Sequence, residues 1–265
     1  MSSQSWWGSL SLVLFFSSCT VIRTAHPDPV DVGLIKNKGE GHITAYVDAN
    51  DETAGLGGSF LISPADNFLV GAGFGTYTYK IFNRSLDLFD ILYDVDRDAG
   101  QLSGYKGRLN AGFYKNFGPS GTHYIEAMLT ATSGRQDLQL SFGTNDTSFM
   151  RIRYNPYSIG IQFAAGKNRE SLRFLGGIKG QAVFFGKDLP LVRTRLARES
   201  SPNSFFLQWF FNARFGKGPV KANVQCSLGY NITAILYTAS FDPITSLSLG
   251  IQYNFGRKKT TEFKL

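Results

Sequence analysis

The sequence predicts an all-β protein, an antiparallel up-and-down β-barrel that spans a membrane with about ten strands. Apolar side chains occupy every even position from Val220 to Leu236, and the odd positions from Lys221 to Thr233 are polar or glycine, as in a strand with one apolar and one polar face. The chain contains 23 Phe and 12 Tyr, which suits a lipid-facing surface with aromatic girdles. Because the sequence lacks a run of about 18 apolar residues, a membrane-spanning form must be a closed barrel.

Five alternating segments predict the first half of the barrel. Residues 41–48 and 54–62 carry apolar side chains at alternate positions and are joined by a short polar tip. Residues 67–80 place large apolar side chains on one face and three glycines on the other. In residues 104–117, and in the strand that begins at His123, aliphatic and aromatic residues alternate with charged and amide residues. Each segment therefore has one face for lipid and one for the lumen.

Five more segments complete the predicted barrel. In residues 147–165 the apolar positions change parity at Asn155-Pro156, which we interpret as a β-bulge near the membrane rim. Residues 172–186 and 204–215 have one apolar face, almost entirely aromatic in the second case. Residues 220–236 and 244–255 bring the count to ten, an even number as in other single-chain bacterial barrels. Eight strands are the alternative if the first hairpin lies outside the wall.

The lengths of the connections predict the orientation of the barrel. Short connections at 63–66, 118–121, 166–171 and 216–219 are expected in the periplasm. The generally longer stretches 81–103, 134–147, 187–203 and 237–243 are expected outside the cell. Both termini then lie on the periplasmic side.

The N-terminus resembles an export signal with a lipidation site. Residues 1–18 are predicted to be a signal peptide, because the apolar run 12–16 precedes Ser17-Ser18-Cys19, a pattern similar to a bacterial lipobox. Cys19 is the expected lipidation site, and its covalent lipid, with acyl chains such as palmitate, is the only non-protein group predicted. An ordinary cleaved signal or a disordered tail is the alternative. The predicted organisation continues with a lipidated N-terminus and linker (19–40), the barrel (41–256) and a basic periplasmic tail (257–265).

The inward-facing positions form a polar cluster rich in cations. Its predicted members are Lys106, Arg108, Glu126, Arg173, Lys179, Gln181, Gln208, Arg214 and Lys221. In a narrow barrel these side chains could fill the lumen as a hydrogen-bonded plug around Glu126. Alternatively, a cationic lumen without compensating charge would favour anions.

Nucleic-acid binding and catalysis are not predicted. The net charge of +7 is spread over strands and turns, without a helix or aromatic platform to collect it, so no nucleic acid is expected as a partner. His26 lies in the linker, and His42 and His123 lie at the periplasmic beginnings of strands. All three histidines are expected to be interfacial or solvated. Since no histidine reaches the extracellular rim, a hydrolase triad is disfavoured.

Metal binding is also not predicted. Within the acidic stretch 87–100, residues 94–100 resemble a calcium loop because carboxylates recur at every second position, at Asp94, Asp96 and Asp98. However, Gly100 arrives one residue late, Tyr105 stands where a glutamate would be needed, and Arg97 opposes a dication. A solvated acidic loop is the preferred interpretation, and no cofactor or metal is expected.

Several motifs resemble predicted outer-membrane β-barrel lipoproteins of Bacteroidota. They are Cys19 with its proline-containing linker, the stretch 34–40 that enters the first strand and ends in Lys38-Gly39-Glu40, the Ser63-Pro64-Ala65-Asp66 turn that leads into the glycine-rich third strand, and the aromatic last strand with its basic tail at 251–259. The resemblance covers nearly the whole mature chain and implies the fold and the outer membrane, but no defined activity. Thr20-Val21-Ile22-Arg23 lacks the acidic residues of surface-exported lipoproteins, which implies a periplasmic anchor.

The sequence thus predicts a non-catalytic outer-membrane lipoprotein, a structural or accessory subunit of a larger translocation, uptake or assembly complex. Its expected partners are outer-membrane lipid and a larger outer-membrane protein. A narrow anion-preferring pore is the second hypothesis, and a barrel enzyme that acts on lipid or peptide is the third.

Overall fold

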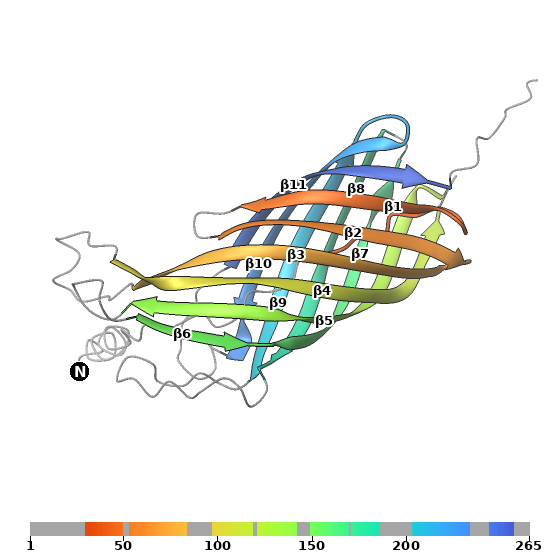
Figure 1. The fold of residues 1–265 in the computed structure, drawn as a ribbon. Coiled ribbons are helices and arrows are strands. Elements are labelled where there is room, and N and C mark those ends of the chain that lie inside the picture. The colour runs from red at the N-terminus through yellow and green to blue at the C-terminus, as the bar shows by residue number, and fades with distance from the viewer. Residues whose placement is uncertain are drawn as a thin grey trace, which may run out of the picture.

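The computed structural model describes residues 30–49, 53–83, 97–118, 121–141, 149–169, 171–185, 203–233 and 244–256. In this part of the chain, eleven strands form one antiparallel sheet that closes into a barrel (Figure 1). The first strand, β1 (Gly41–Ala49), pairs with the last, β11 (Ile244–Phe255). The ring is complete because β4 (Arg97–Phe117) pairs with β5 (His123–Ser141).

The remaining strands lie between these pairs. They are β2 (Thr53–Ala65), β3 (Phe68–Asn83), β6 (Phe149–Tyr154), β7 (Tyr157–Asn168), β8 (Leu172–Phe184), β9 (Asn203–Phe215) and β10 (Val220–Asn231). Both β6 and β7 pair with β5, one above the other, so they are two parts of a single wall strand. The barrel therefore has ten wall positions, which confirms the predicted count. The alternative of eight is wrong, because β1 and β2 belong to the wall.

The predicted β-bulge at Asn155-Pro156 is wrong. Tyr154 pairs with Gln136 and Tyr157 pairs with Ser133, so no residue is inserted across the break. Proline lacks an amide hydrogen, and it interrupts the ladder here without shifting its register. Even-numbered side chains point inward on both sides of the break. What changes is the polarity of the two faces, because above Pro156 the buried residues are apolar and the exposed residues are charged.

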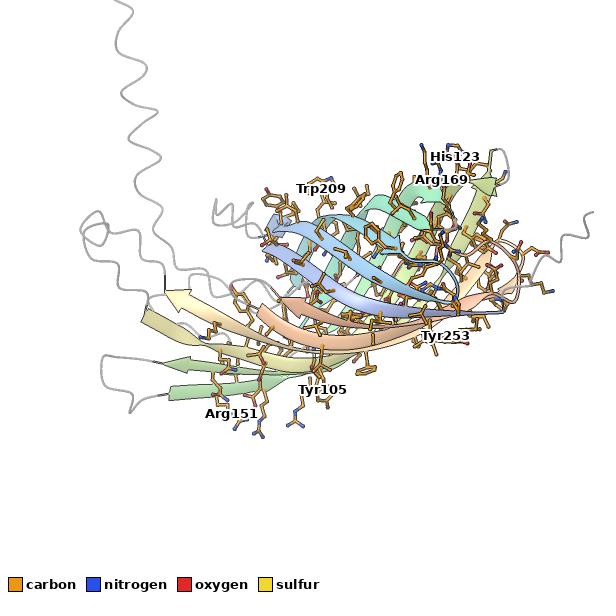
Figure 2. The ribbon with its side chains drawn as sticks, turned by 90° about the horizontal axis from the view of Figure 1, so that it is seen from above. Tyr105, His123, Arg151, Arg169, Trp209 and Tyr253 are labelled. Carbon is orange, nitrogen blue, oxygen red and sulfur yellow. The ribbon has the colours of Figure 1, made fainter. Side chains whose placement is uncertain are left out.

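The outer surface is apolar around the whole ring. Leu109, Phe113 and Ile251, on β4 and β11, each expose about 65% of their surface. Figure 2 shows such side chains projecting away from the wall, including Trp209 and Tyr253. An apolar outer band on a closed barrel with a polar interior is the surface of a membrane-spanning barrel. Among the described residues, no helix is long and apolar enough to cross a bilayer.

One end of the barrel, called here the turn end, carries tight connections and both ends of the sheet. Gly41 pairs with Phe255 there, so the first and last strands meet at this end. The tight turns use residues with positive φ, among them Asn67 at 59° and Gly118 at 78°. The prediction that short connections and both ends of the barrel share one side is therefore correct.

The opposite end, called here the far end, extends beyond the apolar band along β3 to β6 (Figure 1). Its interior is apolar and contains Tyr79, Leu102, Leu138, Ile152, Tyr154, Val183, Phe185, Phe206 and Ile244. Its outer face exposes polar side chains such as Gln101, Arg135, Arg151 and Arg153. This is the pattern of a barrel in water, so the lipid band ends below it.

Three of the predicted strand boundaries are wrong. Residues 97–103 and 134–141, expected in connections, continue β4 and β5, because the ladder persists after the two faces exchange polarity. The strand expected to reach Leu236 ends at Asn231, and residues 232–233 are helical. There the amide of Phe205 donates to the side-chain Oγ1 of Thr233 (2.8 Å).

Candidate functional site: an occupied lumen

Residues 30–35 lie inside the barrel and are all buried. They were expected to form part of a linker, and this expectation is wrong for these residues. The reason is an apolar alternation: Val30, Val32 and Leu34, together with Ile35, pack into one cluster with inward side chains of the wall. Those wall residues are Leu61, Leu69, Tyr114, Tyr124, Met128, Ala164, Leu175 and Phe210. We call residues 30–36 the lumen segment.

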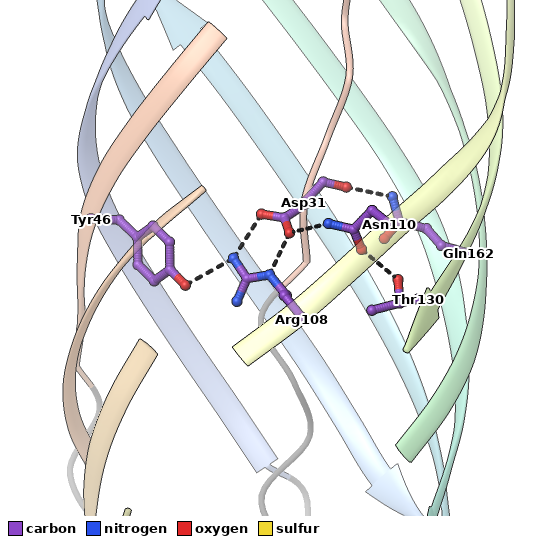
Figure 3. Close-up of polar contacts among 6 residues, drawn as sticks. All are labelled: Asp31, Tyr46, Arg108, Asn110, Thr130 and Gln162. Carbon is purple, nitrogen blue, oxygen red and sulfur yellow. Dashed lines mark hydrogen bonds and ion pairs between the residues drawn. The ribbon is translucent and has the colours of Figure 1, made fainter. Parts of the chain in front are cut away.

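Asp31 anchors the lumen segment to β4 (Figure 3). Its carboxylate accepts hydrogen bonds from Nε of Arg108 and, at 2.8 Å, from Nη2 of the same guanidinium. Asn110 donates to it as well (2.7 Å). Arg108 also donates to the hydroxyl of Tyr46 (3.0 Å), and Thr130 donates to the side-chain oxygen of Asn110 (2.9 Å). The buried ion pair is therefore held in a network of three wall strands.

Every backbone carbonyl from Asp31 to Lys36 accepts a hydrogen bond from a side chain of the wall. The donors are Gln162 to Asp31 (2.8 Å), Arg214 to Val32 and to Gly33 (3.2 Å), Arg173 to Leu34 (3.0 Å), and Asn116 to Ile35 (3.0 Å) and Lys36 (3.2 Å). Arginine and amide donors thus replace the water that these carbonyls would otherwise need.

Glu126 binds the lumen segment through a backbone amide. One of its oxygens accepts the amide of Gly33 (2.9 Å) and the hydroxyl of Tyr124 (3.0 Å). The other oxygen accepts the side-chain amide of Gln162 (2.9 Å). Glu126 therefore satisfies a buried N–H group, while the cations satisfy buried carbonyls.

Most of the predicted lumen cluster is buried, and the segment brings four of its members together. Arg108, Glu126, Arg173 and Arg214 all bond to the lumen segment. Lys106 is half-buried, with Nζ 5.1 Å from the ring centre of Tyr77. The other four are buried elsewhere: Lys221 donates to the carbonyl of Gly216 (2.6 Å), Gln181 to Ser158 (3.0 Å) and Gln208 to Ser227 (2.7 Å), while Lys179 is 2% exposed.

Four residues that complete this site were not among the predicted site residues: Asp31, Asn110, Asn116 and Gln162. Asp31 was assigned to the linker, although its apolar neighbours at 30 and 32 already show the alternation of a buried segment. Asn110, Asn116 and Gln162 face inward and bond to the lumen segment. Their roles depend on the backbone of residues 30–36, so the wall sequence alone does not reveal them.

The histidines differ from one another in their surroundings. His42, expected to be interfacial or solvated, is 1% exposed and lines a cavity of about 20 Å³ together with Asp31 and Arg214, so this prediction is wrong. It fails because His42 lies at an inward position of β1, where the lumen segment covers it. His123 lies half-buried at the turn end with its ring stacked on Phe117, centroids 5.3 Å apart. The cavity beside His42 has room for about one water molecule.

Several predicted features lie outside the described residues: residues 1–29 with Cys19 and His26, residues 87–96 of the acidic stretch, and residues 257–265. Within the described ranges, no group of three His, Cys, Asp or Glu side chains is placed to hold a metal ion. Cys226 is exposed on the outer face of β10. The chemistry of the described site is therefore that of hydrogen bonding to an extended peptide.

Comparison with known proteins gives similarity in fold. Searches against protein-family models and against curated proteins find no match. Among solved structures, the translocator domain of the autotransporter NalP from Neisseria meningitidis is similar, with 12% identity over 83% of this chain and 90% of that chain, and a TM-score of 0.47. An outer membrane channel from Pseudomonas putida F1 (8% identity, 87% and 100% covered, TM-score 0.44) is also similar. A third similar structure is the outer membrane protease OmpT from Escherichia coli, with 10% identity over 82% of this chain and 94% of that chain, and a TM-score of 0.41.

Proposed function

We propose that the protein is a non-catalytic outer-membrane β-barrel lipoprotein that acts as a structural or accessory subunit of a larger outer-membrane translocation, uptake or assembly complex. The observation that supports this proposal is the occupied lumen. Residues 30–35 are buried inside the barrel, and the two cavities beside them hold only about 20 Å³ each. The surfaces offered to other molecules are then the outer wall and the two ends.

The membrane location in this proposal rests on the outer surface of the barrel. A closed barrel with an apolar outer band is the form in which single-chain bacterial proteins cross the outer membrane. In this proposal the lipid on Cys19 adds an anchor in the periplasmic leaflet, next to the turn end where the barrel begins. Acyl chains contribute about 0.8 kcal/mol for each buried methylene, so two or three chains would hold this end firmly.

The far end is the part of the wall best suited to a protein partner. It extends beyond the lipid band and exposes a polar face on β5 and β6. Arg151 donates to both carboxylate oxygens of Asp137, each from Nε at 2.8 Å, and Arg153 lies 3.3 Å from the same carboxylate. The two arginines remain about half exposed, so they can also meet an acidic surface.

The accessory role is tested by purification in mild detergent followed by mass spectrometry. We expect a larger outer-membrane barrel to co-purify with the wild type. Charge reversal by Arg151→Glu with Arg153→Glu should reduce this recovery, whereas Lys38→Glu at the turn end should leave it unchanged. Recovery of the wild type alone, after chemical cross-linking in intact cells, would contradict the proposal.

An anion-preferring pore is a second candidate function, favoured by the charge of the wall. Five cationic side chains are buried on the lumen side of the wall: Arg108, Arg173, Lys179, Arg214 and Lys221. Among the described wall residues, Glu126 is the only buried carboxylate that opposes them. Such a lumen would favour anions if the lumen segment moved away. Planar-bilayer recording separates the two functions: an anion-preferring current reduced by Arg108→Ala and Arg214→Ala supports the pore, and a silent wild type supports the accessory role.

A further inference from the structure

We propose that the lumen is a peptide-binding site, selective for an extended peptide with an aspartate two residues before a glycine, and that residues 30–36 are its tethered, exchangeable occupant. The inference does not depend on the accessory role, because it concerns only the interior of the barrel. It assigns a ligand class to the cationic lumen that the sequence predicts.

The lumen segment is held as a ligand is held, by side chains. Its carbonyls and the amide of Gly33 are bonded by side chains of the wall, not by a backbone ladder. The backbone–backbone bonds that tie this region to the barrel begin later, where Gly39 donates to Ser63 (2.7 Å) and Ser63 donates to Glu40 (2.9 Å). Because these donors bond to main-chain groups, they give affinity without contacting the side chains of the occupant.

Selectivity comes first from Asp31. Arg108 and Asn110 converge on its carboxylate with three hydrogen bonds, and the pair is buried on both sides. A neutral residue here would leave the buried Arg108 without this carboxylate, while its hydrogen bond to the hydroxyl of Tyr46 would remain. An unpaired buried guanidinium is costly, so the site requires an acidic side chain at this position.

Glycine is required two residues later. A Cβ on residue 33 would lie 2.5 Å from the hydroxyl of Tyr124, 2.7 Å from Cδ1 of Leu69 and 2.9 Å from Oε2 of Glu126. All three groups are buried, and Glu126 is fixed by its own hydrogen bonds to Tyr124 and Gln162. Any larger residue would displace the carboxylate that accepts the Gly33 amide.

The wall around the lumen segment retains unpaired polar atoms and small cavities, so water can compete with the segment for its hydrogen-bonding partners. Oδ1 of Asn116, Oδ1 of Asn168 and Nε of Arg214 are buried without a partner in the described structure, and all three side chains also bond to the lumen segment. A cavity lies on each side of the segment, one beside Val32 and one beside Ile35. Leu34 adopts a φ of 46°, which side chains other than glycine rarely adopt, so the bound form is held under strain.

The test uses the full chain, folded first and then cut. A protease recognition sequence is inserted between Lys38 and Gly39, where the side chains are exposed and nothing lies within 4 Å of a Cβ at Gly39. Folding is checked by heat-modifiable migration before cleavage. A fluorescent peptide of residues 28–37 is then added, and its binding is followed by anisotropy, while mass spectrometry follows loss of the original fragment. Uncut protein is the control that keeps its occupant.

We expect the cut barrel to exchange its fragment for the native peptide. A Gly33→Ala peptide, and a peptide of identical composition in which Asp31 and Val32 are exchanged, should bind at least tenfold more weakly. Equal binding of the native and altered peptides would overturn the selectivity. Retention of the original fragment under excess native peptide would overturn the exchange. Either result stands apart from partner recovery, which tests the accessory role.

Discussion

Removing Arg108 should destabilise the protein far more than removing an exposed arginine. Arg108→Ala leaves the Asp31 carboxylate buried without its cation, while Asn110 still donates to it. Breaking a buried ion pair in this way costs about 3–5 kcal/mol. Asp31→Ala leaves the Arg108 guanidinium buried without its carboxylate and should lower the free energy of unfolding by a similar amount.

The double variant Asp31→Ala with Arg108→Ala decides whether the two residues act together. Because neither charge is then left unpaired, it should cost about as much as one single variant, which gives a coupling energy equal to the other single cost, about 3–5 kcal/mol. The free energy of unfolding is measured by reversible urea titration in phospholipid vesicles, with tryptophan fluorescence as the signal.

The exposed pair of Arg151 and Asp137 supplies the matched control. The side chain of Arg151 is 46% exposed, so Arg151→Ala should cost less than about 1 kcal/mol. If Arg108→Ala costs no more than this control, or if the effects of the two single variants simply add, then Asp31 is not paired inside the barrel and the lumen is not occupied as described.

Three further predictions concern the fit of Gly33 in the lumen segment, the lipid-facing surface of the wall, and the closure of the lumen to ions. Gly33→Ala in the full chain should lower the free energy of unfolding by about 1–3 kcal/mol, measured by the same urea titration, because its Cβ meets Tyr124. On β5, Leu129→Arg should cost about 2–4 kcal/mol in vesicles, whereas Gln139→Arg, beyond the lipid band, should change stability by less than about 0.5 kcal/mol; equal costs would contradict the membrane boundary. Val32→Lys places a cation beside Arg214 and should produce an anion-preferring current in planar bilayers, where a silent variant would argue against displacement.

The wall could be predicted from the sequence wherever lipid lies outside and polar groups lie inside. Within the apolar band, the predicted inward and outward sets of β4 and β5 agree with the structure, as Arg108 and Glu126 against Leu109 and Ile125 illustrate. The period of two fixes which side chains share a face, and lipid fixes which face is outside.

The same rule fails beyond the band because it assumes lipid. Ile152 and Tyr154 are apolar and point inward, while Arg151 and Arg153 point outward into a polar environment. A pattern read with lipid in mind therefore places an artificial change of direction at Pro156. Alternation alone determines which residues face the same way, but it does not determine which side is wet.

The alternation at Val30, Val32 and Leu34 is a local sign of burial, but the place of the lumen segment inside the barrel could not be predicted from it, because its contacts are distant in the chain. Asp31 meets Arg108 and Val32 meets Arg214 across 77 and 182 residues. The prolines and polar residues that precede the barrel are typical of a linker. Only the closed wall, with its inward donors, shows that the carbonyls of residues 31–36 have partners there.

The occupied lumen is tested most directly by the accessibility of a thiol placed in it. In a Cys226→Ser background, Val32→Cys and Lys38→Cys variants are reconstituted in vesicles and treated with a membrane-impermeant maleimide. Residue 32 is 3% exposed, whereas residue 38 is exposed at the turn end. We predict that the thiol at 38 reacts at least a hundredfold faster than the thiol at 32. Equal reaction rates at the two positions would contradict an occupied lumen.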